Sequence, residues 1–136
     1  MSSAVTQISV RIYTEDTDLQ GIVYHANYLR YMERARTEMM RDLGFTKPAV
    51  AGGVNMVVTK IALDYRRPAG LDDLLTVTSQ LETIRASTLQ IAQRVERDGE
   101  LLVEATITAA CLSAESQRPV RIPVPMREAL STLLLP

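Results

Sequence analysis

One long helical pattern sets the strongest limit on what this chain can fold into. Between residues 26 and 43, apolar residues recur at spacings of three and four, which is the period of one face of an α-helix. This stripe consists of Tyr28, Met32, Ala35, Met39 and Leu43. Leu29, Tyr31 and Met40 widen it, so the helix needs apolar cover over more than one face. Gly44 follows as a C-terminal stop signal.

Most of the remaining chain has the alternating pattern of β-strands. Strands are predicted over residues 5–13, 54–66, 74–84, 87–97 and 101–114. The last three have one apolar face, which is typical of an antiparallel sheet, and Asp98-Gly99 predicts a tight hairpin. The strand over 54–66 is apolar on both faces in its first half, so we expect both faces to be covered there.

Turn signals and a short helix complete the pattern. Residues 14–24 predict a loop with Gly21 as its flexible point, and Pro48 with Gly52-Gly53 predicts another loop after the long helix. Residues 126–135 predict a short helix, since Pro125 is tolerated near a helix start.

One broad-faced helix and a set of one-sided strands together predict an α+β fold. A curved antiparallel sheet wrapped around the long central helix would satisfy both patterns. With 136 residues, the chain is expected to form a single domain over residues 1–136. A sheet of four or five strands leaves an unpaired edge, which a symmetric dimer would remove. We therefore expect a homo-oligomer that brings a second subunit near the loop.

Charge and composition argue against several classes of function. Lys and Arg total 15 and Asp and Glu total 16, so a net charge of -1 gives no reason to expect nucleic acid as a partner. No apolar run approaches the roughly 20 residues that span a bilayer. Residues 1–10 lack the pattern of a signal peptide. The only cysteine, Cys111, can form no intrachain disulfide, and we expect a cytoplasmic protein.

The residues that carry chemistry are concentrated directly before the long helix. The run from Glu15 to His25 contains Asp16, Asp18 and the only histidine of the chain. A helix N-terminus offers backbone N–H donors that can stabilise an oxyanion, and a facing carboxylate can handle the attacking group. A thioester suits such a site, because its leaving thiol has a pKa near ~8.5–9 and needs no strong general acid.

Asp18 is the candidate catalytic carboxylate. It could take a proton from water or attack the carbonyl itself, and the residues alone do not choose. The backbone N–H of His25 could polarise the carbonyl, while its imidazole could instead orient Asp18 or shuttle a proton. Structural roles are the alternative: Asp16 and Asp18 as turn residues, and His25 as a residue of the helix start.

Several other side chains are expected to be structural. Tyr24, Tyr28 and Tyr31 are predicted to lie in the core, and Cys111 to be inert packing. A solvated or paired helix face is predicted for Glu33, Arg34, Arg36 and Glu38. The sequence has no G-x-S-x-G, H-E-x-x-H, P-loop or G-x-G-x-x-G motif. One histidine and one cysteine are too few for a usual zinc site, so neither a metal nor a cofactor is expected.

The loop motif resembles that of a known family, the hotdog-fold 4-hydroxybenzoyl-CoA thioesterases. The nearest branch is that of the acyl-CoA thioesterases associated with the Tol-Pal system. The similar residues are Glu15-Asp16-Thr17-Asp18, Gly21-Ile22-Val23-Tyr24-His25, Asn27-Tyr28 and Tyr31-Met32-Glu33-Arg34-Ala35-Arg36. Weaker similarity continues in Asp64-Tyr65-Arg66-Arg67-Pro68-Ala69, Leu71-Asp72-Asp73 and Gln93-Arg94-Val95.

The resemblance implies a fold, an assembly and a set of site residues. The implied fold is the hotdog, with homodimers that share a continuous sheet, often pair into tetramers and bind acyl-CoA at the subunit interface. The essential carboxylate falls on Asp18 and the carbonyl-polarising amide on His25, with Tyr24 as a candidate substrate-binding residue. The turn before the fourth strand suggests Arg85 and Ser87 as contacts of the coenzyme A nucleotide, although the same turn also fits an ordinary exposed hairpin end.

The leading prediction is an acyl-CoA thioesterase that releases a free acid and CoA, and three alternatives stay open. One is a thioesterase for acyl groups held on an acyl carrier protein. A second is a hotdog enoyl-CoA hydratase or dehydratase, against which the Asp18–His25 separation and the missing Asn-Pro between them argue. The third is a non-catalytic acyl-CoA sensor or interaction scaffold, which the intact D-x-D-x-x-G motif disfavours.

Overall fold

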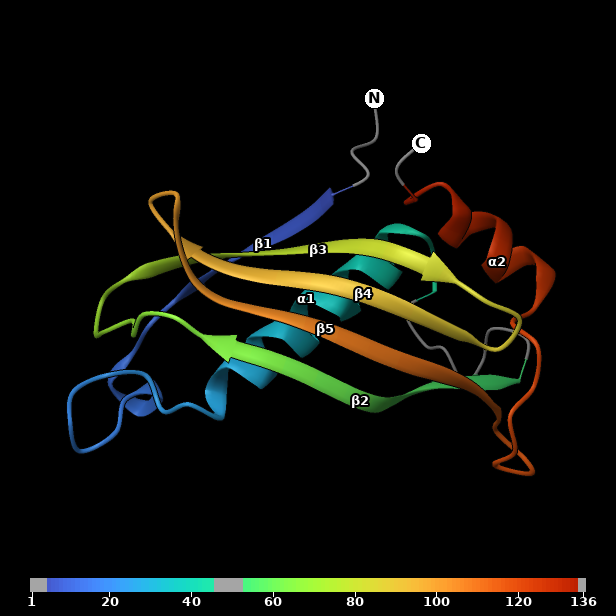
Figure 1. Ribbon diagram of the computed structural model, residues 1–136, viewed down its shortest axis with the longest axis horizontal. Helices are drawn as coiled ribbons and strands as arrows, with labels where there is room; N and C mark the ends of the chain where they lie inside the picture. Colours follow the sequence, from blue (N-terminus) through green and yellow to red (C-terminus); the bar gives the residue numbers. More distant parts are fainter. Residues whose placement is uncertain (1–4, 46–52, 135–136) are drawn as a thin grey trace.

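A single antiparallel sheet of five strands, in the order β1-β3-β4-β5-β2, runs the length of the molecule (Figure 1). The computed structural model describes residues 5–45 and 53–134. The strands are β1 (Val5–Arg11), β2 (Val54–Tyr65), β3 (Leu74–Ile84), β4 (Thr88–Arg97) and β5 (Glu100–Ser113). The helical elements are the 3₁₀ turn η1 (Thr14–Asp16), α1 (Asn27–Asp42) and α2 (Val124–Ser131). The loop predicted around Pro48 and Gly52 lies outside the described residues.

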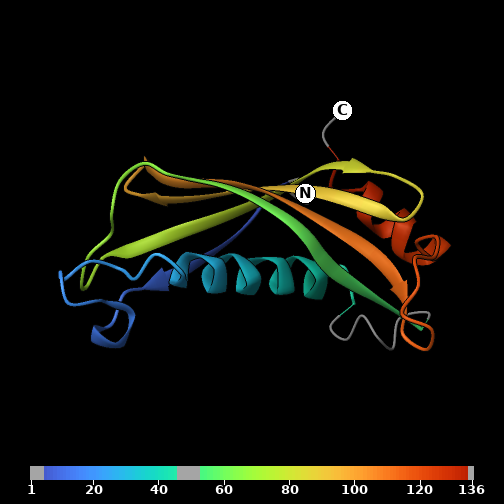
Figure 2. The same ribbon diagram turned by 60° about the horizontal axis from the view of Figure 1, so that its bottom comes forward.

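The long helix α1 lies against one face of the sheet, which twists over it (Figure 2). Its buried residues are Tyr28, Tyr31, Met32, Ala35 and Met39, and Leu43 at the C-cap is half-buried. Gly44 follows with a φ of 92° and donates its N–H to the Arg41 carbonyl at 2.9 Å. The predicted helix, its apolar stripe and its stop signal are therefore confirmed.

The inward-facing residues of β3, β4 and β5 form the other half of the core. Along β3 and β4 they alternate as predicted, with Leu75, Val77, Leu81, Leu89, Ile91 and Val95 all buried. At the predicted hairpin between β4 and β5, Asp98 and Gly99 have φ values of 49° and 81°, as a type I′ turn requires. Cys111 on β5 is fully buried, which confirms its packing role and raises the pKa of its thiol.

One prediction about β2 is wrong for the single chain. Val57 and Val58 lie in the half that was expected to be covered on both faces, yet each is 38% exposed, and Ile61 beyond them is 41% exposed. The reason is its position, because β2 is an edge strand that pairs only with β5, while α1 packs against β1 and β3. The described chain thus presents an apolar, unpaired sheet edge.

The C-terminal helix begins two residues earlier than predicted and closes one end of the sheet. It starts at Val124 with Pro125 in its first turn, and Met126 and Leu130 are completely buried. Neither α1 nor α2 combines the length and the apolar character that a helix needs to cross a membrane.

Candidate active site

The loop before α1 is held in shape by Asp16. Its Oδ2 accepts the Tyr13 N–H at 2.8 Å and closes the turn of η1. Its Oδ1 accepts the Asn27 side-chain amide at 3.2 Å, and its carbonyl accepts the Tyr24 N–H at 2.9 Å. Asp16 therefore joins the beginning of the loop to the beginning of the helix, which is the structural role predicted as the alternative for this residue.

Asp18 lies at the turn of a small hairpin formed by Thr17 and Val23. Its backbone N–H donates to the Ile22 carbonyl at 2.9 Å, and its Oδ1 accepts the Gln20 N–H at 2.8 Å. Gly21 completes the turn with a φ of 79°, which favours glycine. The second carboxylate oxygen accepts no hydrogen bond from residues 5–45 and 53–134. The half-buried carboxylate of Asp18 is thus oriented through one oxygen, and the other has no hydrogen-bond partner in these residues.

The N-terminus of α1 also has polar groups without a protein partner. Ala26 at the N-cap makes no side-chain capping bond. Within the described parts of the chain, the N–H groups of His25 and Ala26 donate to no protein acceptor. Each of these N–H groups shares a peptide plane with the carbonyl of the preceding residue, and both carbonyls are hydrogen-bonded. The Tyr24 oxygen accepts the Asn27 N–H at 2.8 Å, and the His25 oxygen accepts a hydrogen bond from the Tyr65 hydroxyl at 2.7 Å. Two backbone donors at the helix N-terminus, which we call the helix mouth, are therefore held in place without a protein acceptor.

The side chains around the helix mouth are aromatic. The exposed His25 imidazole lies with its ring centroid 4.6 Å from the Tyr24 ring and 6.3 Å from the Tyr65 ring. No hydrogen bond joins the imidazole to Asp18 in the described chain. Tyr24 is 47% exposed, so its predicted place in the core is wrong, whereas Tyr28 and Tyr31 are buried as predicted. Tyr24 is exposed because it precedes the helix and lies outside its buried stripe.

A buried hydroxyl lies behind the loop. The Tyr31 hydroxyl has no hydrogen-bond partner among the described residues. Its burial raises the pKa of Tyr31 to about 12, and the nearby Asp16 carboxylate acts in the same direction. Tyr31 therefore stays protonated at neutral pH and contributes packing rather than charge.

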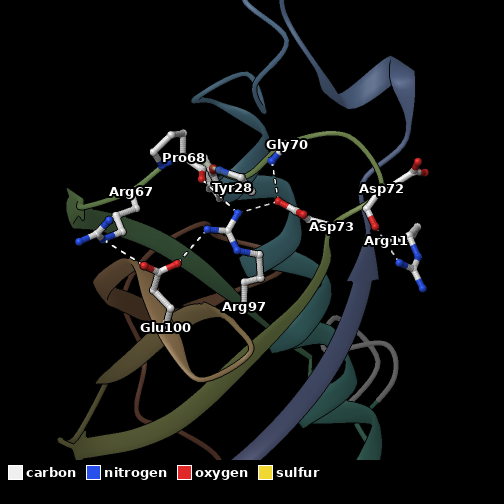
Figure 3. A network of polar contacts seen from close by, with 10 residues as sticks. Arg11, Tyr28, Arg67, Pro68, Gly70, Asp72, Asp73, Arg97 and Glu100 are labelled. Atoms are coloured by element: carbon white, nitrogen blue, oxygen red, sulfur yellow. Dashed lines mark hydrogen bonds and ion pairs between the residues drawn. The ribbon is translucent and has the colours of Figure 1, made fainter.

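The turn between β2 and β3 supports the loop from behind. The Ala69 carbonyl accepts the Val23 N–H at 2.9 Å, and the Ala69 N–H donates to the Tyr28 hydroxyl at 3.1 Å. Close by, Asp73 accepts the Gly70 N–H at 2.8 Å and pairs with Arg97 (Figure 3). The Gly70 N–H and the Arg97 guanidinium lower the pKa of Asp73. Sequence reasoning matched this turn to the family pattern but gave its residues no role.

The other predicted substrate contacts, Arg85 and Ser87, lie far from Asp18 within one chain. They form the turn between β3 and β4, which lies next to α2 at the opposite end of the sheet from the loop (Figure 1). The Ser87 carbonyl accepts the Cys111 N–H at 2.7 Å, and the Arg85 carbonyl accepts a hydrogen bond from the Arg127 guanidinium. The fold thus joins Asp18, Tyr24 and His25 but leaves Arg85 and Ser87 outside their surroundings.

An apolar groove of about 530 Å³ runs along α1 toward the open edge of the sheet. Leu29, Met40, Met56 and Ile61 are among its lining residues. Arg36 also lines it, as a half-buried side chain that donates from Nη1 to Gln93 Oε1 at 2.8 Å. Among residues 5–45 and 53–134, no three His, Cys, Asp or Glu side chains gather as metal ligands.

Comparison with known proteins places the chain in a family. Residues 12–130 match the family model of the thioesterase-like superfamily. The acyl-CoA thioesterase YbgC of Haemophilus influenzae is 40% identical, covering 91% of this chain and 93% of that protein. The acyl-CoA thioester hydrolase YbgC of Escherichia coli O6:H1 is 38% identical, covering 90% of this chain and 93% of that protein.

The same relationship appears in three dimensions. The crystal structure of a probable thioesterase from Bartonella henselae matches with a TM-score of 0.81 and 32% identity, covering 88% of this chain and 99% of that one. The predicted hotdog fold, with its sheet wrapped around one long helix, is confirmed. By the match to its family model and its identity to these relatives, this chain belongs to the thioesterase-like superfamily.

Proposed function

We propose that this protein hydrolyses acyl-CoA thioesters to a free carboxylic acid and CoA, with Asp18 and the mouth of α1 as its catalytic groups. The observation that carries this proposal is a carboxylate with one open oxygen on the loop that leads into two unpartnered amides. The names of the relatives agree with it, since the Haemophilus influenzae protein is named an acyl-CoA thioesterase.

The geometry supports a two-stage reaction. In one form, Asp18 takes a proton from water as the water oxygen bonds to the thioester carbonyl carbon. In the other form, the carboxylate itself attacks, and water then hydrolyses the mixed anhydride. In both forms the carbonyl oxygen becomes an oxyanion that accepts hydrogen bonds from the His25 amide and its neighbour. The C–S bond then breaks and the thiolate of CoA leaves with the electron pair.

Thiol release tests this proposal directly. The protein is incubated with a panel of aliphatic and aromatic acyl-CoAs, and with an acyl carrier protein carrying the same acyl groups. Release of free thiol from the CoA substrates supports the proposal, and preferential release from the carrier protein would replace CoA as the substrate. Loss of enoyl-CoA absorbance without thiol release would indicate a hydratase instead. Thermal stabilisation by acyl-CoA without any reaction would indicate a sensor.

The role assigned to His25 predicts a mild effect of removing its side chain. Because the oxyanion donor is a backbone N–H, His25→Ala keeps it. We expect a loss in kcat of less than about tenfold, below the range typical of a lost acid or base. Steady-state thiol release measures this value. A loss as large as that of the Asp18→Asn variant would instead assign catalysis to the imidazole.

The proposed assembly is a cytoplasmic homotetramer built as a dimer of dimers. Its support is the unpaired, apolar edge at β2, which a second copy would cover by continuing the sheet. In such an assembly the substrate would lie at a subunit interface. It would contact Tyr24 of one subunit, and its CoA nucleotide would contact Arg85 and Ser87 of another. This arrangement would account for the distance between these residues in the single chain.

The exposed edge at β2 allows the proposed assembly to be tested by a substitution. Ile61→Lys places a charge on this edge, and we expect the dimer dissociation constant to rise about tenfold to a hundredfold, because burying an Ile is worth ~1.5–3 kcal/mol. Sedimentation equilibrium measures the change. The matched control is Val124→Lys, at an apolar residue that is 64% exposed at the start of α2. Equal dissociation constants for the two variants would argue against an interface at β2.

A further inference from the structure

Ala69 and Gly70, in the turn between β2 and β3, contact both halves of the proposed site. On one side, Ala69 accepts the Val23 N–H, and Gly70 pairs with Ile22 in an isolated antiparallel bridge. On the other side, the Ala69 N–H donates to the hydroxyl of Tyr28, in the first turn of α1. Ala69 is 1% exposed, so water does not compete for these bonds. One buried segment therefore sets the position of the acid loop relative to the helix mouth.

On each side, one further residue links the Ala69–Gly70 segment to a proposed catalytic group. Ile22, which pairs with Gly70, accepts the backbone N–H of Asp18 at 2.9 Å. Tyr28 lies one helical turn beyond His25. A shift of the Ala69–Gly70 segment would therefore move Asp18 and the helix mouth relative to each other.

The segment is held from the far side by charged groups. Asp73 Oδ2 accepts the Gly70 N–H at 2.8 Å and a guanidinium N–H from Arg97 Nη1 at 2.7 Å. Arg97 comes from the end of β4, and its side chain points at the turn that holds Gly70 and Asp73 (Figure 3). The side chains of this pair are only 29% and 28% exposed, so water screens their attraction less than that of a surface pair.

A third charge fixes Arg97 itself. Its Nη2 donates to Glu100 Oε1 at 2.8 Å across the β4–β5 hairpin, and Glu100 Oε2 pairs with Arg67 Nε at 3.1 Å. Arg67 and Pro68 begin the same turn that holds Ala69. The Arg97 guanidinium therefore links the turn between β2 and β3 to the β4–β5 hairpin, which is part of the rigid sheet.

We propose that Arg97 and Asp73 are positioning residues for thioester hydrolysis, which act by holding the Ala69–Gly70 segment that orients Asp18 and the start of α1. This inference rests on the proposed function. In this proposal neither side chain touches the substrate. Because reaction rates fall steeply when reacting groups are displaced by a fraction of an ångström, weakening this support should reduce kcat more than KM.

The test compares Arg97→Gln with a matched ion-pair variant. Arg66→Gln removes an arginine that directly follows β2 and breaks its pair with Glu104. No hydrogen bond described for this pair involves Ala69 or Gly70. We expect kcat to fall about tenfold in Arg97→Gln relative to Arg66→Gln, with KM changed less than about threefold. Asp73→Asn, whose amide oxygen can still accept the Gly70 N–H, should show the same pattern and serves if Arg97→Gln does not fold. Arg97→Lys should recover part of the loss.

A structural readout separates this inference from the proposed function. Hydrogen exchange at the Val23 amide, which donates to Ala69, should become faster in Arg97→Gln or Asp73→Asn and stay unchanged in Arg66→Gln. A kcat loss no larger than that of Arg66→Gln, or unchanged exchange at Val23, overturns the inference. If the wild-type protein releases no thiol from any substrate, the proposed function fails, while exchange at Val23 still decides whether Arg97 and Asp73 hold the loop.

Discussion

Replacing Asp18 by Asn is expected to reduce kcat for acyl-CoA hydrolysis by about 10²- to 10⁴-fold, the range usually lost with a general base. The amide cannot take a proton from water and is a poor nucleophile, so both forms of the mechanism fail. The fold should survive, because Asn Oδ1 can still accept the Gln20 N–H that shapes the turn. Thiol release under saturating acyl-CoA measures kcat, and sedimentation verifies that the assembly is unchanged.

The control for this experiment makes the same chemical change elsewhere. Asp42→Asn removes an exposed carboxylate at the end of α1, far along the helix from the loop. We expect its kcat to stay within about twofold of the wild type, since exposed surface changes are usually small. A wild-type rate in Asp18→Asn would remove this residue from the mechanism. Equal losses in both variants would point to a general effect of charge rather than to catalysis.

Gln93→Leu is expected to destabilise the protein by about 2–4 kcal/mol, because it removes three hydrogen bonds and leaves Ser79 Oγ and the Arg36 guanidinium without this partner. Gln93 is completely buried on β4. Its Nε2 donates to the Met32 carbonyl at 2.9 Å and to Ser79 Oγ at 2.8 Å, and its Oε1 accepts from Arg36 at 2.8 Å. Leucine has a similar size but no polar atoms, so the loss comes from unpaired groups and not from a cavity. Urea unfolding measures the change in free energy.

A second substitution separates the contribution of Arg36 from the rest. Burial lowers the pKa of the Arg36 guanidinium, which shows that its charge is poorly solvated. Arg36→Met removes this charge, so Gln93→Leu should cost about 1–2 kcal/mol less in the Arg36→Met background than in the wild type. Gln90→Leu, on the same strand but only half-buried, should change stability by less than about 0.5 kcal/mol. Equal costs for Gln93→Leu and Gln90→Leu would contradict this account of the network.

Local sequence patterns predicted the features that depend on neighbouring residues. The helix over 26–43 follows from its period of three and four, and the β4–β5 hairpin follows from Asp98-Gly99, because both depend on backbone preferences a few residues apart. The proposed joint role of Asp18 and the helix N-terminus was also inferred from neighbouring residues. The acid and the His25 amide lie on one short loop that leads directly into the helix.

Predictions failed or stayed open where burial depended on distant parts of the chain. Tyr24 looked like a core residue by composition, but it precedes the helix and lies outside the buried stripe. The first half of β2 looked covered on both faces, yet its place at the edge of the sheet leaves Val57 and Val58 partly exposed in the single chain. The turn of Arg85 and Ser87 lies at the opposite end of the sheet from Asp18 (Figure 1), which only the direction and length of β3 reveal.

The helix, the one-sided strands and the acidic loop before the helix are each encoded by residues that are close along the chain, so local patterns are enough to predict them. Which strand lies at the exposed edge, and which residues lie behind the loop, depends on how distant segments pack together. Ala69, Asp73 and Arg97 come from turns and strands far along the chain. Ala69 bonds to Val23 and Tyr28, on either side of the helix start, only because the strands order as β1-β3-β4-β5-β2. Strand order is set by the burial of the whole core, a property of the assembled chain that no local pattern contains.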